Sequence, residues 1–118
     1  MAVKWIEHKG VRILYADFSG LVMNTQLMPV LDEAYQQFRR EKGKVRTLLN
    51  FTDAVIDKEF MNYVKEQGKS NLAENTEKDA YVGITGVKNV LLRAYLYVTK
   101  DPARVFDREN EALDWLAE

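Results

Sequence analysis

The sequence contains no cysteine and a single histidine, His8. The lack of cysteine excludes disulfides, thiolate metal ligands and a thiol nucleophile. His8 has no second imidazole to form a metal site and no adjacent nucleophile to activate, so we interpret it as a solvated turn residue. Because the chain lacks a complete catalytic or metal-binding set, we expect no metal, no cofactor and no enzymatic activity.

Long apolar runs and a net charge are missing as well. No run approaches the roughly 18 apolar residues of a membrane span, and the N-terminal stretch MAVKWIEHKG lacks the apolar core of a signal peptide. The chain has 17 basic and 18 acidic residues, so no overall field attracts nucleic acid or anionic lipid. We therefore expect a cytoplasmic protein without a membrane span, whose partner is a protein, a second copy of the chain or a small ligand.

The chain does contain alternating strand and helix patterns within one domain-sized length of 118 residues. Val3 to Glu7 and Val11 to Phe18 are rich in β-branched and aromatic residues and are separated by His8, Lys9 and Gly10, which predicts a hairpin. In the second segment both alternating sets are apolar, as in a central strand covered on both faces. We expect a single domain, residues 1–118, that begins with this hairpin.

Helical periodicity follows the hairpin. The apolar residues from Leu27 to Phe38 recur at helical spacing. Pro29 limits the start of regular helix to about Gln26, and Gly43 ends it. Val45 to Phe51 predicts a third strand.

The second half repeats the alternation. Asp57 is the expected N-cap of a helix carrying Phe60 and Val64, which ends near Ala73. Four further segments follow, predicted as a strand at Ala80 to Ile84, a helix at Val87 to Val98 stopped by Pro102, a short edge strand at Arg104 to Phe106, and a last helix capped by Asp107 with Glu109 and Glu111 in its first turn.

The resulting order, ββαβαβα(β)α, predicts an α/β fold with a mixed, largely parallel sheet of four to five strands packed by helices. The leading hairpin supplies an antiparallel edge. Leu14, Leu49, Val82 and Leu113 are expected to share one buried core.

Three stretches carry a resemblance to a known family: LLNFTD, AYVGITGVKNVL and RVFDRENEALDWL. With the element order, they make residues from about Lys9 to Leu116 resemble the STAS-like, or SpoIIAA-like, branch of the anti-sigma-factor antagonist fold. The resemblance implies a non-enzymatic regulatory or protein-binding role.

The loop after the third strand departs from the phospho-switch members of that family. Those members have an Asp-Ser-Ser-Gly motif there, whose serine accepts phosphate. Here the loop reads NFTDAVIDKEF, in which Asp57 matches the aspartate while Lys58 and Glu59 stand where the hydroxyl residues would be. Thr52 is the loop's only hydroxyl residue, so we expect no phospho-serine switch.

This loop and the start of the second helix form the predicted partner-binding surface. Met61 lies about 100° round the helix from Phe60, which predicts an exposed apolar surface suited to a protein partner or a homodimer. The alternative is that Met61 only covers a neighbouring loop. The predicted contact residues are Thr52, Asp53, Asp57, Lys58, Phe60 and Met61.

Several alternatives remain beside this surface. Gly83, Thr85, Gly86 and Lys88 lie between a strand and a helix, where backbone N–H groups could hold an anion; the competing interpretation is a tight turn. A carrier or sensor of a small apolar or anionic ligand near these residues is thus the alternative function. Asp53 and Asp57, with Asp17, could serve a metal-assisted hydrolase, or could only shape turns and cap a helix.

Overall fold

The structure, a computed structural model, describes residues 2–68, 75–99 and 103–118. Across these residues five strands alternate with four helices. They are β1 (Val3–His8), β2 (Val11–Asp17), α1 (Asn24–Arg40), β3 (Val45–Asn50), α2 (Lys58–Gly68), β4 (Thr76–Val82), α3 (Val87–Thr99), β5 (Ala103–Phe106) and α4 (Glu109–Leu116).

The five strands form one mixed sheet in the order β1-β2-β3-β4-β5. β1 pairs with β2 in antiparallel fashion through a turn in which Lys9 and Gly10 both have positive φ, as a two-residue type I′ hairpin requires. Every other pair is parallel. The predicted α/β class, the antiparallel edge and the short strand β5 are confirmed.

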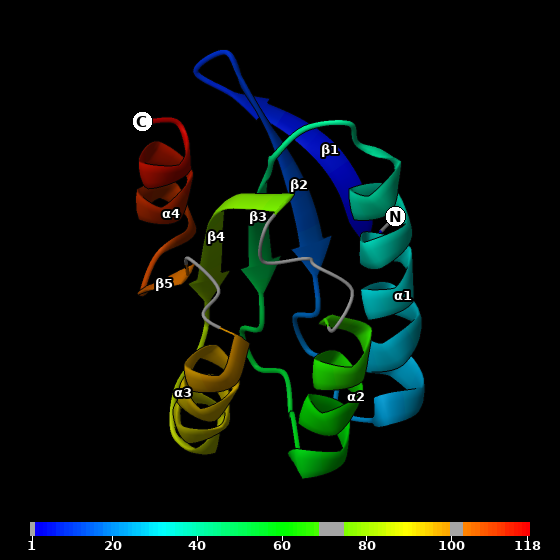
Figure 1. Cartoon of the computed structure of the whole chain (residues 1–118). Coiled ribbons are helices and arrows are strands. Elements are labelled where there is room, and N and C mark those ends of the chain that lie inside the picture. The colour runs from blue at the N-terminus through cyan, green and yellow to red at the C-terminus, as the bar shows by residue number, and fades with distance from the viewer. Residues whose placement is uncertain (1, 69–74, 100–102) are drawn as a thin grey trace.

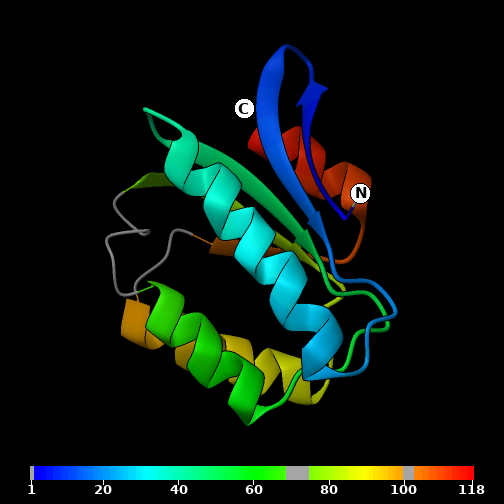
Figure 2. The ribbon, with the colours of Figure 1, turned by 90° about the vertical axis from the view of Figure 1, so that its right-hand side faces the viewer.

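The helices cover the two faces of the sheet unequally. α1, α2 and α3 lie on one face, and α4 lies on the other (Figures 1 and 2). This arrangement is expected because α1, α2 and α3 each connect neighbouring parallel strands in the same direction along the sheet. Crossover connections of the same handedness then place their helices on the same face. The last helix is then the element that remains to cover the second face.

The core is divided by the sheet, so the prediction of one shared core is wrong. Leu14 and Leu49 belong to the cluster under α1, α2 and α3, whereas Val82 and Leu113 belong to the cluster under α4. Successive side chains of a strand point to opposite faces. The double apolar pattern of β2 therefore supplies both cores, with Ile13 on the α4 side.

The first helix begins at Asn24, two residues before the predicted limit at Gln26. Pro29 removes one helical hydrogen bond inside α1. The first turn nevertheless forms, because the Gln26 side chain accepts the backbone N–H of Val22 at 3.2 Å and of Met23 at 3.3 Å. This cap satisfies backbone donors at the helix start.

Two boundaries in the second half also differ from the prediction. β4 spans Thr76–Val82 rather than Ala80 to Ile84; Glu77 accepts a hydrogen bond from Arg46, and Lys78 donates one to the Trp115 carbonyl. The N-cap of α4 is Arg108 rather than Asp107, because the Arg108 carbonyl accepts the first helical N–H, from Ala112. The predicted helix end near Ala73 and the stop at Pro102 fall outside the described residues.

Candidate functional site

The loops that follow β2, β3 and β4 meet at the carboxyl edge of the sheet. The Phe18 N–H donates to the Asn50 carbonyl at 2.8 Å, and the Phe51 N–H donates to the Val82 carbonyl at 2.8 Å. The Gly20 N–H donates to the Thr52 carbonyl at 2.9 Å. These bonds continue the sheet pairing past the strand ends, so the three loops form one connected edge.

Gly83 and Lys88 fix the β4 loop against the β3 loop. A Cβ added at Gly83 would lie 2.4 Å from the Thr52 backbone nitrogen, and Gly83 has a φ of +82°. The Lys88 ammonium donates to the Phe51 carbonyl at 2.9 Å. This geometry supports the tight-turn interpretation, while Thr85 and Gly86 lie exposed beside it. Anion binding at these residues stays a prediction.

Thr52 and Asp53 are exposed at the tip of the β3 loop. The Thr52 hydroxyl donates to the Asn50 side-chain oxygen at 2.7 Å, and the Thr52 N–H donates to the same oxygen at 3.0 Å. Asp53 adopts a φ of +57°, which aspartate tolerates better than most residues do. These contacts shape the turn and leave both side chains within reach of a partner.

Asp57 is the N-cap of α2, as predicted. Its Oδ1 accepts the backbone N–H of Phe60 at 2.8 Å. The side-chain amide of Asn24 donates to the Asp57 carboxylate, at 3.2 Å for the closer oxygen, and to Glu59 at 3.3 Å, so the starts of α1 and α2 are joined. Within the described ranges no three acidic or histidine side chains gather as a metal-binding group.

The prediction of an exposed apolar surface at the start of α2 is wrong. Phe60 is only 1% exposed and Met61 only 7% exposed. The Phe60 ring packs edge-on against Phe18 and Phe51, with centroids 6.3 and 6.4 Å away. Because α2 packs against both α1 and α3, side chains 100° apart on it are covered together. Lys58 remains exposed beside them.

A cavity of about 90 Å³ lies between the sheet and the helices α1, α2 and α3, partly open to solvent. Its lining is predominantly apolar and includes Ala34 and Phe38 from α1, Phe60 and Met61 from α2, and Leu92 from α3. The sheet contributes Leu14, Ala16, Leu49 and Tyr81. The apolar residues predicted to touch a partner at the surface therefore line an internal space instead.

Three polar side chains, Thr47, Thr76 and Asp79, interrupt this apolar lining. Thr47 and Asp79 are partners across the parallel pair β3 and β4, and the Thr47 hydroxyl donates to the Asp79 carboxylate. Asp79 is 5% exposed. Sequence reasoning missed Thr76 and Asp79 because it began the fourth strand at Ala80. The available signal was Thr47, a hydroxyl residue that alternates in β3 with the core residues Val45 and Leu49.

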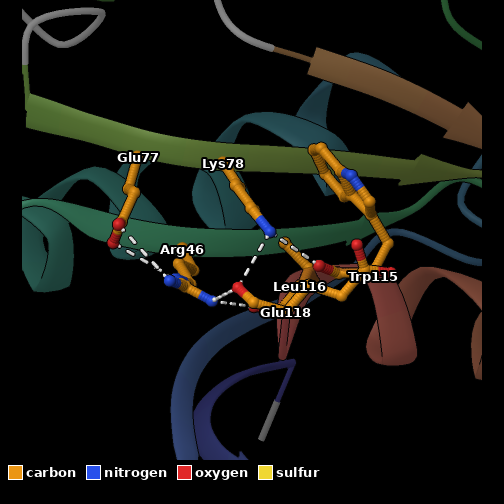
Figure 3. Close-up of polar contacts among 6 residues, drawn as sticks. All are labelled: Arg46, Glu77, Lys78, Trp115, Leu116 and Glu118. Atoms are coloured by element: carbon orange, nitrogen blue, oxygen red, sulfur yellow. Dashed lines mark hydrogen bonds and ion pairs between the residues drawn. The ribbon is translucent and has the colours of Figure 1, made fainter.

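On the opposite side, two cations hold the end of α4 to the sheet (Figure 3). Arg46 donates to the Leu116 carbonyl and, at 2.9 Å, to the Glu118 carbonyl. Lys78 donates to the Trp115 carbonyl at 2.9 Å and to the Glu118 carbonyl at 3.0 Å. Cations at a helix C-terminus complement its dipole, so both residues have a structural role.

His8 is also structural rather than a purely solvated residue. Its Nε2 lies 2.8 Å from Asp114 Oδ1, and Lys9 Nζ lies 3.1 Å from the same oxygen. These contacts lower the pKa of Asp114, the hydrogen bond with His8 being the largest cause. They join the hairpin to α4.

Taken together, the sheet order, the single antiparallel edge and the division of the helices between the faces define a SpoIIAA-like, or STAS-like, fold. A structure with this fold that matches the chain is that of an uncharacterized protein from the DUF3478 family of Shewanella loihica PV-4. The match has a TM-score of 0.68 and 17% identity, and it covers 98% of this chain and 92% of that chain. At this identity the likeness shows the fold alone. Searches against protein-family models and the curated proteins find no match.

In the described part of the chain, no helix has the length and apolar character needed to cross a membrane.

Proposed function

We propose that the protein is a non-catalytic binding module that takes up a small apolar ligand in the cavity between the sheet and α1, α2 and α3. The single observation that carries this proposal is the cavity itself, with its apolar lining from three helices and the sheet. Small-molecule sites are typically concave and mostly apolar, with a few polar groups that orient the ligand.

The size of the cavity supports a role beyond imperfect packing. Protein interiors contain few voids larger than a water molecule. A ligand that filled this space of about 90 Å³ would cover the apolar side chains that line it, and removing apolar surface from water favours binding.

The burial of Phe60 and Met61 favours ligand uptake over the surface contact predicted at α2. A partner protein could reach these side chains only if α2 moved, because each is less than 10% exposed. A small ligand reaches the same side chains by entering the cavity that they line.

The test is to fill the cavity. Ala34, from α1, lines the cavity and is 8% exposed. We expect Ala34→Met to weaken binding of 1-butanol at least about tenfold, measured by NMR chemical-shift titration, because the added atoms occupy the ligand's space. Ala94→Met is the matched control, since Ala94 is an exposed residue of another helix in the same layer.

Wild-type shifts confined to cavity-lining residues, together with loss of binding only in Ala34→Met, would support the proposal. Equal binding by wild type and Ala34→Met, or shifts spread over the α4 face, would contradict it.

Self-association is a second candidate function, favoured by an exposed apolar patch at the carboxyl edge of the sheet. Val22, Met23 and Val55 are each more than half exposed. The Val55 N–H donates to the Leu21 carbonyl at 2.9 Å, which places the two loops side by side. We expect Met23→Asp to lower the mass measured by light scattering at high concentration; a wild type that stays monomeric would rule this function out.

A further inference from the structure

A second cleft lies on the face of the sheet that α4 covers only in part. α4 packs mainly on β3, β4 and β5, so the same face of the β1–β2 hairpin stays partly open. The cleft has a volume of about 210 Å³ and is lined by Lys4 and Ile6 from β1, Tyr15 and Asp17 from β2, and Glu109 from α4. It is separated by the sheet from the apolar cavity under α1, α2 and α3.

The strand register builds two walls of this cleft. Lys4 and Tyr15 are cross-strand partners, and Asp17 follows Tyr15 two residues later on the same face. The Lys4 ammonium lies over the Tyr15 ring, 5.7 Å from its centroid. Glu109, the first residue of α4, supplies the wall beside the sheet.

The charged groups that line the cleft do not pair with one another. Among the described residues, no ion pair joins Lys4 to Asp17 or to Glu109. Asp17 Oδ1 accepts the backbone N–H of Ser19 at 2.9 Å, which leaves further acceptor sites on the carboxylate. Two formal negative charges and one positive charge therefore border one open space.

Tyr15 shows where the negative potential of the cleft acts. Its side chain is 9% exposed, and its hydroxyl accepts a hydrogen bond from the Asn50 amide at 3.3 Å. Burial is the largest cause that raises the pKa of Tyr15, the Asn50 hydrogen bond lowers it, and the charges of Glu109 and Asp17 raise it further. Both carboxylates thus act on the same wall, where a cationic group is favoured.

We propose that this cleft binds a free amino acid with a cationic side chain, of the lysine type. The two ammonium groups of such a ligand pair with Asp17 and Glu109, and its carboxylate pairs with Lys4. Its aliphatic chain lies along Ile6 and the Tyr15 ring. This site is independent of the apolar cavity and of the function proposed for it.

Charge, rather than size, selects this ligand class. A cavity of about 150 Å³ holds benzene, so an open cleft of about 210 Å³ admits many small molecules. A diamine would leave Lys4 without a counter-charge, and an amino acid with an apolar side chain would leave one of the two carboxylates without one. A basic amino acid matches the cleft in both the number and the sign of its charges.

The experiment compares three probes that share a carbon chain. L-lysine is the complete ligand, norleucine lacks the side-chain ammonium, and cadaverine lacks the carboxylate. Their affinities for the wild-type protein are measured by NMR chemical-shift titration at pH 7 and constant low ionic strength. We expect L-lysine to bind at least about threefold more tightly than either analogue, with shifts confined to β1, β2 and the start of α4. The differences should shrink in about 0.5 M salt, because salt screens exposed charges.

Two substitutions assign the charges to residues. Lys4→Gln should abolish the preference for L-lysine over cadaverine and keep the preference over norleucine, because only the partner of the carboxylate is lost. Glu109→Gln should have the reverse effect. Glu111→Gln is the matched control for Glu109, since Glu111 lies in the same first turn of α4 but does not line the cleft. Lys42→Gln, at an exposed residue after α1, is the control for Lys4. Both controls should keep both preferences.

The proposal is overturned if L-lysine does not bind, if it binds no more tightly than norleucine and cadaverine, or if its shifts lie on residues of α1, α2 and α3. Equal losses of preference in Glu111→Gln and Glu109→Gln would also overturn it, because the attraction would then belong to the surface in general. None of these results bears on the apolar cavity, whose test uses 1-butanol and a different set of residues.

Discussion

Replacing Gly83 by alanine tests the close approach of the β3 and β4 loops. An added Cβ would lie 2.4 Å from the Thr52 nitrogen and 2.6 Å from the Thr52 Cα, both backbone atoms. The loop that contains Thr52 is held at 2.9 Å by the Gly20 N–H, and Lys88 holds the neighbouring Phe51 carbonyl. The clash cannot be relieved by a side-chain rotation.

Two costs add up in Gly83→Ala. The φ of +82° is unfavourable for alanine by about 1–2 kcal/mol, and forcing backbone atoms apart in a packed region costs about 1–3 kcal/mol. We expect a loss of about 3 kcal/mol in the free energy of unfolding. Since small domains are stable by about 5–15 kcal/mol, the variant should fold but be clearly weakened.

Urea denaturation followed by circular dichroism measures this loss. With a slope of about 2 kcal/mol per molar urea, the midpoint should fall by about 1.5 M. Gly20→Ala and Gly86→Ala are matched controls, because both glycines have positive φ but no described atom within 4 Å of an added Cβ. If Gly83→Ala lowers the free energy of unfolding by less than about 1 kcal/mol more than each control does, the close approach does not constrain the loop and the reasoning fails.

Three further predictions concern the packing of Phe60, the Asp57 helix cap and the contact between Arg46 and Glu77. Phe60→Ala should lower the free energy of unfolding, measured by urea denaturation, by about 3–5 kcal/mol, because the substitution removes a ring that is only 1% exposed from the aromatic cluster. A loss below about 1 kcal/mol would mean that α2 is loosely packed. Asp57→Ala should cost about 1 kcal/mol and Asp57→Asn much less, since asparagine also caps a helix; equal losses would show that the cap hydrogen bond is unimportant. The pKa of Glu77 is lowered, and the hydrogen bond from Arg46 is the largest cause. Because the folded-state pKa lies below the unfolded-state pKa, ionised Glu77 stabilises the fold above the unfolded-state pKa, and this stabilisation is lost as pH falls through the folded-state pKa. The stability difference between wild type and Glu77→Gln should therefore be small at pH 6, because Glu77 is half exposed, and should vanish toward pH 3; a difference that persisted at pH 3 would exclude the charge as its origin.

The candidate site was only partly accessible to sequence reasoning. The Asp57 cap and the tight turn at Gly83 were foreseen because each depends on residues close in sequence or on one residue's backbone preference. The burial of Met61 was not foreseen. Helical periodicity indicates which residues share a helix face, but it does not indicate how many neighbouring elements cover that helix.

The sequence by itself determined the kinds of elements, their order and the covering of β2 on both faces. These features follow from local periodicity and from turn residues, which act over a few positions of the chain. The tertiary structure decided that Leu14 and Val82 belong to different cores and that α2 is covered by two helices. It also decided that Thr47 and Asp79 meet at the end of an apolar cavity. These properties depend on residues about thirty or more positions apart and on the space left between packed side chains, which no local pattern encodes.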